Sequence, residues 1–336
     1  MLPLSNGSDS YQSAAFRIQE ASAVGEVRRF AVKLAEALEM NDVQKTELSI
    51  VVNELGNNIW KYASGGHLIL RRVCELGATG VEVLAVDAGP GMNLSQTMID
   101  GFSSGSTPGT GLGAVRRIAS VFDVHSVLSH GTVVLAQVLK QAGLAKYQVG
   151  AVCIPYPGET FCGDGWSTES HGDGVRALVV DGLGHGPLAH AAAVEAIAVG
   201  REDKDSPLER VLPSVHSRLK GTRGAAVFFA DCSPSKIVFS GVGNIKGFLT
   251  LTGRLKHLLS QNGTAGLQMR LVPPITERWD GAGSLILHSD GLNSRFDLQK
   301  YPGLLTRHPS IIAATLWRDS SRGTDDATVL VIRTAK

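Results

Sequence analysis

The sequence lacks the marks of several large protein classes. Its four cysteines form no CxxC pair and no histidines fall at zinc-finger spacing, so we expect reduced thiols and no zinc finger. The net charge of +1 gives no electrostatic reason to bind nucleic acid or an anionic membrane. No uncharged apolar run approaches the ~20 residues of a membrane helix, and the first residues lack a signal peptide's basic and apolar segments. These absences predict a cytoplasmic protein whose partners include no nucleic acid and no membrane.

The amino-acid composition is typical of soluble globular domains. Hydrophobic residues make up 43% and charged residues 19% of the 336 residues, and this length predicts two folded domains. The pattern along the chain divides into a polar tail (1–14), a first domain (15–140), a linker (141–146) and a second domain (147–336). Arginine pairs such as Arg71-Arg72 are interpreted as solvated faces of the elements that carry them.

The first domain mixes helices and strands in an order that predicts a compact α/β unit. Apolar residues recur at helical spacing over 23–40, and Asn41-Asp42 then caps a second helix that stops at Gly65-Gly66. The remaining predicted elements are strands over 67–73 and 81–87, a Gly-, Ser- and Pro-rich loop over 89–109, a helix over 112–122 and a strand over 131–139.

The second domain is dominated by short apolar strands, which predicts a layered α+β architecture. The predicted strands cover residues 147–154, 175–181, 224–230, 236–242, 284–290 and 327–333. The predicted helices cover residues 188–199, 208–219 and 310–318.

Four short motifs of the first domain carry polar residues or glycines beside its helices. In "NELGNN", Glu54 and Asn58 are four residues apart, so they share one face of a helix; taken alone, they are read as solvent-exposed. In "VDAGPGM", Asp87 ends a strand and two glycines follow it.

The other two motifs are "GTGLG", at the start of a predicted helix, and "HGTVV", before the last strand. Glycine at a helix start lets backbone N–H groups approach a phosphate, aided by the helix dipole. The chain contains no GxxxxGK[ST], so the usual phosphate loop is excluded.

In this order the four motifs resemble the GHKL ATPase family, whose fold is the Bergerat α/β sandwich. The resemblance implies that Glu54 is the general base, that Asn58 ligates the magnesium ion on ATP, and that Asp87 accepts from the adenine amino group. It implies that the chain passes close to the base at Gly89 and Gly91, and that Thr132 assists at the adenine. The glycines that would wrap the phosphates are Gly109, Gly111 and Gly113.

Within that family, no phosphoacceptor histidine helix precedes the domain, which argues against a histidine kinase. The stretch "KTELSIVVNELGNNIWKYASGG" is most similar to the serine/threonine kinases of bacterial partner-switching systems, in the stressosome switch-kinase branch.

Aspartates recur at strand ends and turns of the second domain. They lie in "CGDGW", "VVDGLGHG", "HSDGL" and "GTDDATVL", and the residues concerned are Asp164, Asp181, Asp290, Asp325 and Asp326. Gathered carboxylates repel one another unless a cation lies between them, and hard divalent ions prefer carboxylate and carbonyl oxygens. Asp-Gly is also a common turn, but four such motifs beside apolar strands favour a metal site that the glycines let the main chain approach.

These four motifs resemble the metal-dependent protein phosphatase 2C superfamily, most closely its SpoIIE branch, which implies a β-sandwich flanked by helices. By that resemblance Asp164, Asp181, Asp290 and Asp325 bind two manganese or magnesium ions, with a carbonyl from Gly182. The Asp325-Asp326 doublet leaves the last ligand open. His185 is expected beside the ligands or in solvent, and no counterpart of the early phosphate-gripping arginine of eukaryotic members is found.

Together the resemblances imply a bacterial regulator that joins an ATP-dependent serine/threonine kinase to a metal-dependent serine/threonine phosphatase, both acting on a STAS-type partner. The alternative is a phosphatase whose ATP-binding domain is a non-catalytic docking module for a sigma factor or another regulator. Glu54 favours catalysis, because a docking module needs no base near the phosphate. A pair of decayed adaptors is disfavoured because the expected metal and nucleotide positions are occupied.

Overall fold

The computed structural model describes residues 11–93, 111–143, 146–251, 254–270, 273–279 and 283–335. The chain forms two compact units, and neither is one continuous stretch of sequence. The one-sheet unit comprises Ser13–Leu144 and Asp297–Arg318, and the two-sheet unit comprises Met1–Gln12, Ala145–Phe296 and Asp319–Lys336.

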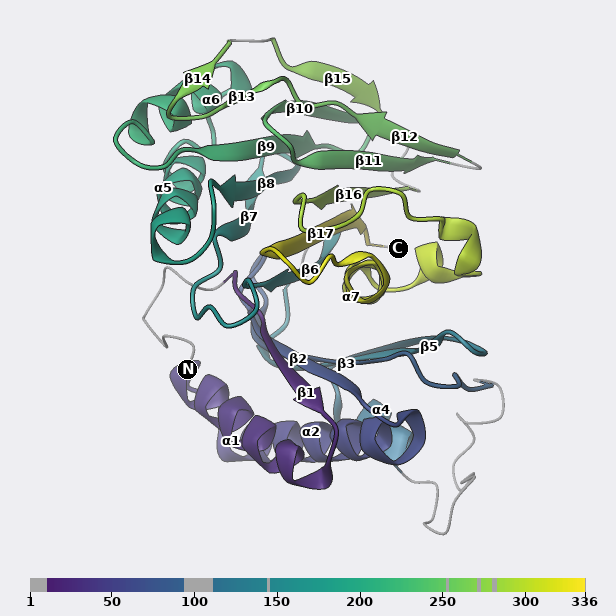
Figure 1. Ribbon diagram of the computed structural model, residues 1–336. Helices are drawn as coiled ribbons and strands as arrows, with labels where there is room; N and C mark the ends of the chain where they lie inside the picture. Colours follow the sequence, from purple (N-terminus) through teal and green to yellow (C-terminus); the bar gives the residue numbers. More distant parts are fainter. Residues whose placement is uncertain are drawn as a thin grey trace. The chain divides into compact units, whose positions relative to one another are not determined.

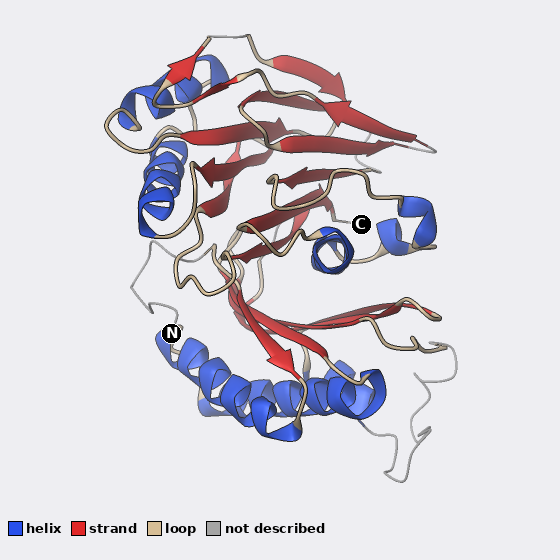
Figure 2. Ribbon diagram, viewed as in Figure 1, coloured by secondary structure: helices blue, strands red, loops and turns tan. Residues whose placement is uncertain are grey.

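The one-sheet unit is an α/β sandwich built on an antiparallel sheet with the strand order β1-β2-β3-β5-β4. Figure 2 shows α1, α2 and α4 together on one side of this sheet. The strands are β1 (Ala14–Ile18), β2 (Gly66–Val73), β3 (Thr79–Asp87), β4 (Val121–Val127) and β5 (Gly131–Gln141). The helices are α1 (Ala21–Ala37), α2 (Asp42–Ala63), α4 (Gly111–Ile118), α7 (Pro309–Ser320) and the 3-10 turns η1 (Leu298–Lys300) and η2 (Leu304–Thr306).

Local sequence explains where α2 begins and ends. The Asn41 side chain accepts from the Gln44 N–H at 2.9 Å, and the Gln44 side chain accepts from the Asn41 N–H at 3.0 Å, which is a capping box. At the other end Ser64 adopts a left-handed conformation and Gly65 has φ +126°. The predicted cap and stop are confirmed.

Successive side chains of β3 point alternately to the face of the sheet that packs against the helices and to the opposite face, which is also buried. Val81, Val83 and Ala85 belong to the core formed with α1, α2 and α4, so Glu82 points to the opposite face. There the Ser310 hydroxyl of α7 donates to Glu82 Oε2 at 2.7 Å. Residues 297–318 therefore pack against the side of the sheet that α1 and α2 leave uncovered (Figure 1).

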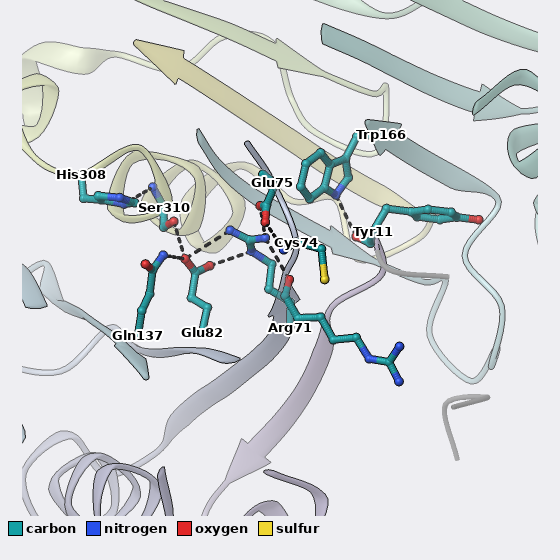
Figure 3. Close-up of polar contacts among 10 residues, drawn as sticks. Tyr11, Arg71, Cys74, Glu75, Glu82, Gln137, Trp166, His308 and Ser310 are labelled. Carbon is teal, nitrogen blue, oxygen red and sulfur yellow. Dashed lines mark hydrogen bonds and ion pairs between the residues drawn. The ribbon is translucent and has the colours of Figure 1, made fainter. Parts of the chain in front are cut away.

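A charged network lies on this second face, and Figure 3 shows its members converging on one carboxylate. Arg71 Nε donates to Glu82 Oε1 at 2.8 Å, Arg71 Nη1 pairs with Glu75, and the Gln137 amide donates to Glu82 Oε2 at 2.7 Å. Arg71 and Glu82 are both buried. Burial is the largest single influence and raises the pKa of Glu82, but the charges of Arg71 and His308, together with the hydrogen bonds from Arg71 and Gln137, lower it overall. The interpretation of Arg71 as part of a solvated face is therefore wrong.

The two-sheet unit stacks two antiparallel sheets. Their strand orders are β15-β10-β9-β8-β7 and β12-β11-β16-β17-β6, with a small β13-β14 hairpin. The first sheet and hairpin contain β7 (Asp164–His171), β8 (Gly174–Gly182), β9 (Ala225–Cys232), β10 (Lys236–Val242), β13 (Gly263–Thr264), β14 (Gln268–Met269) and β15 (Ile275–Arg278). The second contains β6 (Tyr147–Ile154), β11 (Lys246–Leu251), β12 (Arg254–Leu258), β16 (Ser284–His288) and β17 (Ala327–Thr334), and the helices are α5 (Pro187–Glu202) and α6 (Leu208–Arg218). The predicted fold class is confirmed for both units.

Two segments differ from expectation. The helix predicted over 112–122 ends at Ile118, and Val121 and Phe122 open β4 instead; the Ser120 N–H already donates to the Gln137 carbonyl at 2.8 Å. In the segment predicted as a polar tail, residues 11–14 are buried, and the Trp166 indole donates to the Tyr11 carbonyl at 2.7 Å. Among the described helices, none combines the length and the apolar character that crossing a membrane requires.

Candidate functional site

In the one-sheet unit, Glu54 and Asn58 lie on successive turns of α2 and face the start of α4. Both are half-buried. A Cβ built on Gly111, the first residue of α4, would lie 2.7 Å from Glu54 Oε2 and 3.9 Å from Asn58 Nδ2. The helix start expected at a triphosphate is therefore in contact with the expected base and magnesium ligand. Gly113 lies in the first turn of α4, and Gly109 lies outside the described residues.

Asp87 occupies the end of β3, where its carboxylate organises the following loop. Asp87 Oδ1 accepts from the Gly89 N–H at 2.8 Å and from the Thr132 N–H at 3.2 Å. Burial raises the pKa of Asp87, while these two N–H groups and the Arg318 charge partly oppose the rise. Among the described residues no hydrogen bond reaches Asp87 Oδ2, which leaves that oxygen for an amino group.

Three glycines around Asp87 are required by close approaches within the chain itself. A Cβ on Gly89 would lie 2.8 Å from Ala63 at the end of α2, and one on Gly91 would lie 2.4 Å from the Val127 carbonyl. A Cβ on Gly131 would lie 2.1 Å from the Asp87 carbonyl. The last two also have positive φ, +70° and +89°. These glycines draw the loop after β3 against α2, β4 and β5.

A hydroxyl pair that the sequence reasoning missed lies next to Asp87. Thr132 is buried, and its Oγ1 lies 2.9 Å from Ser126 Oγ on β4. Ser126 Oγ also accepts from the Met92 N–H at 2.8 Å. The "GPGM" turn is thereby fastened to the strand that carries Ser126. No sequence signal singled out Ser126, because β4 was predicted in part as helix.

In the two-sheet unit, antiparallel pairing places Asp164 directly opposite Asp181. Asp164 begins β7 and Asp181 lies near the end of β8, and the two are register partners. Asp164 is 1% exposed, and its Oδ2 accepts from the Ser289 hydroxyl at 2.6 Å. Ser289 in turn accepts from the Thr328 N–H at 3.0 Å. Because β16 and β17 belong to the other sheet, Asp164 lies where the two sheets meet.

The remaining acidic side chains come from the turns that follow β16 and precede β17. Asp290 Oδ2 accepts from the Asn244 amide at 2.6 Å. Asn244 belongs to "SGVGNI", and neither it nor Ser289 had been given a role from the sequence. Ser289 lies in "HSDGL", directly before the predicted ligand Asp290, so its position beside that ligand was an available signal, whereas Asn244 lies in none of the four acidic motifs.

The two carboxylates of the Asp325-Asp326 doublet differ in burial. Asp325 is half-buried and accepts from the Asp326 N–H at 2.9 Å. Asp326 is buried, its Oδ1 accepts from the Tyr156 N–H at 2.8 Å, and its Oδ2 has no hydrogen-bond partner among the described residues. Asp325 is thus the more accessible of the two, while Asp326 joins the doublet to the loop after β6.

The carboxylates repel one another electrostatically. Burial, followed by the charges of Asp290 and Asp325, raises the pKa of Asp181 to about 8. Burial and the Asp181 charge raise the pKa of Asp164, and burial also raises the pKa values of Asp325 and Asp326. A divalent cation among these groups would reverse the effect, because it stabilises the ionised form.

The glycines of "VVDGLGHG" lie at close approaches or have positive φ, and Gly182 packs against α5. A Cβ on Gly182 would lie 2.2 Å from the Ala189 carbonyl, and Gly184 and Gly186 have φ values of +82° and +75°. His185 is exposed, stacks on Tyr156 at 4.4 Å between ring centroids and lies 3.0 Å from Glu159 Oε1. The expectation that these glycines let the main chain reach an ion stays a prediction.

The donor chemistry of this acidic cluster fits a hard divalent ion, although the cluster is not a closed coordination shell. Its oxygen atoms belong to carboxylates, and Asp326 Oδ2 beside them is buried without a hydrogen-bond partner among the described residues. Within the part of the chain that the structure describes, no three acidic, histidine or cysteine side chains are gathered closely enough to hold a metal ion. Ser289 and Asn244 hold two of the carboxylates by hydrogen bonds instead.

Comparison with known proteins finds relatives of two kinds, kinase-like and phosphatase. Residues 18–138 match the family model of the histidine kinase-like ATPase domain. The serine/threonine-protein kinase RsbT of Bacillus subtilis (strain 168) is 32% identical over 110 residues, which are 32% of this chain and 83% of RsbT. The phosphoserine phosphatase RsbX of the same organism is 24% identical over 141 residues, 40% of this chain and 70% of RsbX.

Among solved structures, one from work on the bacterial stressosome as a modular system matches 56% of this chain and all of its own chain. Its TM-score is 0.51 and its sequence identity is 25%. These similarities confirm the predicted pairing of a serine/threonine kinase-like part with a phosphoserine phosphatase-like part.

Proposed function

Because this chain belongs to the histidine kinase-like ATPase family, we propose that it phosphorylates a serine or threonine of a STAS-type partner and removes the same phosphate. The one-sheet unit is the ATP-dependent kinase, and the two-sheet unit is the metal-dependent phosphatase. The protein works in the cytoplasm, and the phosphorylation state of its partner decides which regulator, such as a sigma factor, that partner binds.

In the kinase, α2 and α4 supply the reacting groups. Glu54 takes the proton of the acceptor hydroxyl as phosphoryl transfer proceeds. Asn58, one turn further along α2, holds the magnesium ion of ATP, and the N–H groups at the start of α4 bind the phosphates. Asp87 accepts from the adenine amino group, with Thr132 beside it.

In the phosphatase, Asp164, Asp181, Asp290 and Asp325 would hold two manganese or magnesium ions with the Gly182 carbonyl. Bound divalent ions supply an activated water and neutralise phosphoryl oxygens. Ser289 and Asn244 orient two of these carboxylates, as hydrogen-bonding partners of metal ligands do. Asp326 remains buried and fixes the Asp325 turn to Tyr156.

The proposal rests mainly on one observation about each unit: the expected base lies at the helix start expected to bind phosphate, and two expected metal ligands are paired across neighbouring strands. Glu54 lies against Gly111 at the start of α4, and Asp164 is paired with Asp181 across two strands. A unit that served only for docking would have no need of Glu54 at that position.

One contact favours a second candidate function, in which the ATP-binding unit regulates the phosphatase without transferring phosphate. Arg318 Nη1 donates to the Asp87 carbonyl at 2.8 Å. Arg318 lies in the segment that connects two of the acidic motifs, Asp290 and Asp325, along the chain. Nucleotide bound at Asp87 would then influence the segment that contains Arg318, and this segment continues along the chain to Asp290 on one side and Asp325 on the other.

An experiment on one protein separates the two functions. The parent protein and the Glu54→Gln variant are incubated with labelled ATP, magnesium and a panel of STAS proteins, and label on serine or threonine is measured. Transfer by the parent that Glu54→Gln abolishes supports the kinase. ATP-dependent change of phosphatase activity without any transfer, equal in both proteins, supports the regulatory module instead.

A further inference from the structure

Arg223 is an exposed arginine in the turn before β9, and it forms no ion pair or hydrogen bond with the described residues. Other arginines of the same unit are engaged: Arg176 pairs with Asp231 and Arg201 pairs with Glu169. A guanidinium carries five planar donors whose geometry matches the oxygens of a phosphate. The donors of Arg223 are therefore available to a ligand.

The pairing of β8 with β9 brings Arg223 to the loop that follows Asp181. Beyond the strand end, the Leu183 N–H donates to the Gly224 carbonyl at 3.0 Å. Arg223 consequently lies beside Gly184, and its Nη1 is 2.9 Å from the position that a Cβ on Gly184 would take. This position is fixed by backbone pairing and not by the arginine side chain alone.

The same loop borders the acidic cluster. A Cβ built on Gly163 would lie 3.2 Å from the Gly184 carbonyl oxygen and 2.7 Å from Asp326 Oδ2. Gly184 is therefore close to the guanidinium of Arg223 and, across Gly163, to the buried carboxylate of Asp326. A phosphate that met metal ions on the acidic cluster would have a cationic donor at the cluster's edge.

Two exposed leucines lie near Gly224, the residue that follows Arg223. Leu183, whose backbone N–H donates to the Gly224 carbonyl, is 41% exposed, and Leu267 is 59% exposed. Leu267 Cγ is 3.2 Å from the position of a Cβ on Gly224. Two exposed apolar side chains near a phosphate-binding cation suit a phosphorylated protein segment better than a small phosphate ester.

We propose that Arg223 binds the phosphate of a phosphoserine segment, and that Leu183 and Leu267 contact apolar side chains next to that phosphoserine. The inference rests on the proposed phosphatase function and adds a phosphate-binding residue and a preference for substrate sequence. Arg322 is the competing cation, because it lies close enough to Asp325 to act on that carboxylate electrostatically. Its position next to an expected ligand favours a role at the metal centre.

The test compares Arg223→Ala, Arg223→Lys, Arg322→Ala and the control Arg201→Ala in the full-length protein with manganese. The readouts are KM for p-nitrophenyl phosphate, the inhibition constant of inorganic phosphate, and manganese affinity by calorimetry. We expect Arg223→Ala to raise KM and the inhibition constant at least about tenfold, as loss of a charged hydrogen bond does. Manganese affinity should stay at the parent value, and Arg223→Lys should recover part of the phosphate affinity.

The apolar contacts are tested with Leu267→Ser and two phosphoserine peptides, one with leucine and one with serine flanking the phosphoserine. The parent should prefer the leucine peptide, and Leu267→Ser should lose that preference while keeping the parent KM for p-nitrophenyl phosphate. Parental phosphate inhibition in Arg223→Ala, or a larger effect of Arg322→Ala, overturns the assignment of Arg223. If the parent hydrolyses none of these substrates with manganese, the proposed phosphatase fails and this inference fails with it.

Discussion

Ser310 Oγ donates to Glu82 Oε2 at 2.7 Å, across 228 positions of the sequence. The bond joins α7 to the centre of the sheet in the one-sheet unit. Glu82 accepts in addition from Arg71 and Gln137, so its buried charge is surrounded by donors. Residues from near the C-terminal end of the chain are therefore part of the ATP-binding unit.

Removal of the Glu82 carboxylate should destabilise the protein far more than removal of the Ser310 hydroxyl. Glu82→Ala leaves the buried Arg71 with Glu75 as its remaining carboxylate, and we expect a loss of about 3 kcal/mol in the free energy of unfolding. Ser310→Ala removes one hydrogen bond and should cost about 1 kcal/mol. Urea unfolding followed by circular dichroism measures both. An exposed pair supplies the control: Glu195→Ala should have little effect, because Glu195 and Arg218 are both solvent-exposed.

Asp181→Asn tests the acidic cluster. The substitution keeps the volume of the side chain but removes a charge, so manganese affinity and phosphatase turnover should fall together. ATP affinity of the same variant should equal that of the parent, because that site is built from other elements. Calorimetry with manganese and with ATP on one sample gives both values, and full manganese-dependent turnover would remove Asp181 from the site.

The raised pKa values of the acidic cluster also predict how the metal-free protein responds to pH. Asp181 has a folded pKa of about 8 against an ordinary value of 3.8, so between these values the folded state binds more protons than the unfolded state. Stability of the metal-free protein should therefore decrease as pH rises through this window. Manganese should reverse the trend, because it stabilises the ionised carboxylates. Thermal unfolding at pH 5, 6.5 and 8, with chelator and with manganese, tests this; a metal-free melting temperature that rises with pH would contradict it.

Asp87 should select adenine over guanine. Its free Oδ2 accepts from an amino group, whereas guanine presents a carbonyl at the same place and would leave two acceptors facing each other. The parent should bind ATP more tightly than GTP, and Asp87→Ala should bind ATP at least about tenfold more weakly. Because Asp87 also fastens the Gly89 and Thr132 N–H groups, Asp87→Asn is the matched variant that keeps the shape of the loop. Equal affinity of the parent for ATP and GTP would count against this role.

Features that depend on neighbouring residues were predicted from the sequence, and features that depend on distant contacts were not. The Asn41 cap and the strand-end position of Asp87 follow from local chemistry, and both were predicted. The boundary between α4 and β4 was missed because Val121 and Phe122 continue the helical spacing of Val115 and Ile118. Only pairing with β5 makes them a strand.

The buried network around Arg71 and Glu82 was not predicted either, because its members are distant in the sequence. The arginine pair at Arg71 carries no local sign of burial, and its partners Glu82 and Ser310 lie far away in the sequence. The acidic motifs of the second half were found because each is a short pattern at a strand end. Their supporting groups, Ser289 and Asn244, are recognised only when the two sheets are seen to bring them to those carboxylates.

The roles of Glu54 and Asn58 should separate in binding and transfer. Glu54→Gln should bind ATP with magnesium nearly as well as the parent, yet transfer phosphate on the order of 10²-fold more slowly, because a general base acts in the transition state. Asn58→Ala should lose magnesium-dependent ATP affinity itself. Both variants should keep the manganese-dependent phosphatase. Calorimetry beside transfer of labelled phosphate distinguishes them, and equal transfer by Glu54→Gln and the parent would exclude Glu54 as the base.

The central claim is that one chain adds and removes the same phosphate. The most direct measurement follows one serine or threonine of a STAS partner by phosphopeptide mass spectrometry, first with ATP and magnesium and then after exchange into manganese without nucleotide. The account predicts that phosphate appears in the first step and leaves in the second, that Glu54→Gln blocks only the first, and that Asp181→Asn blocks only the second. A parent protein that binds ATP and removes phosphate, but phosphorylates none of its physiological partners, would contradict the claim.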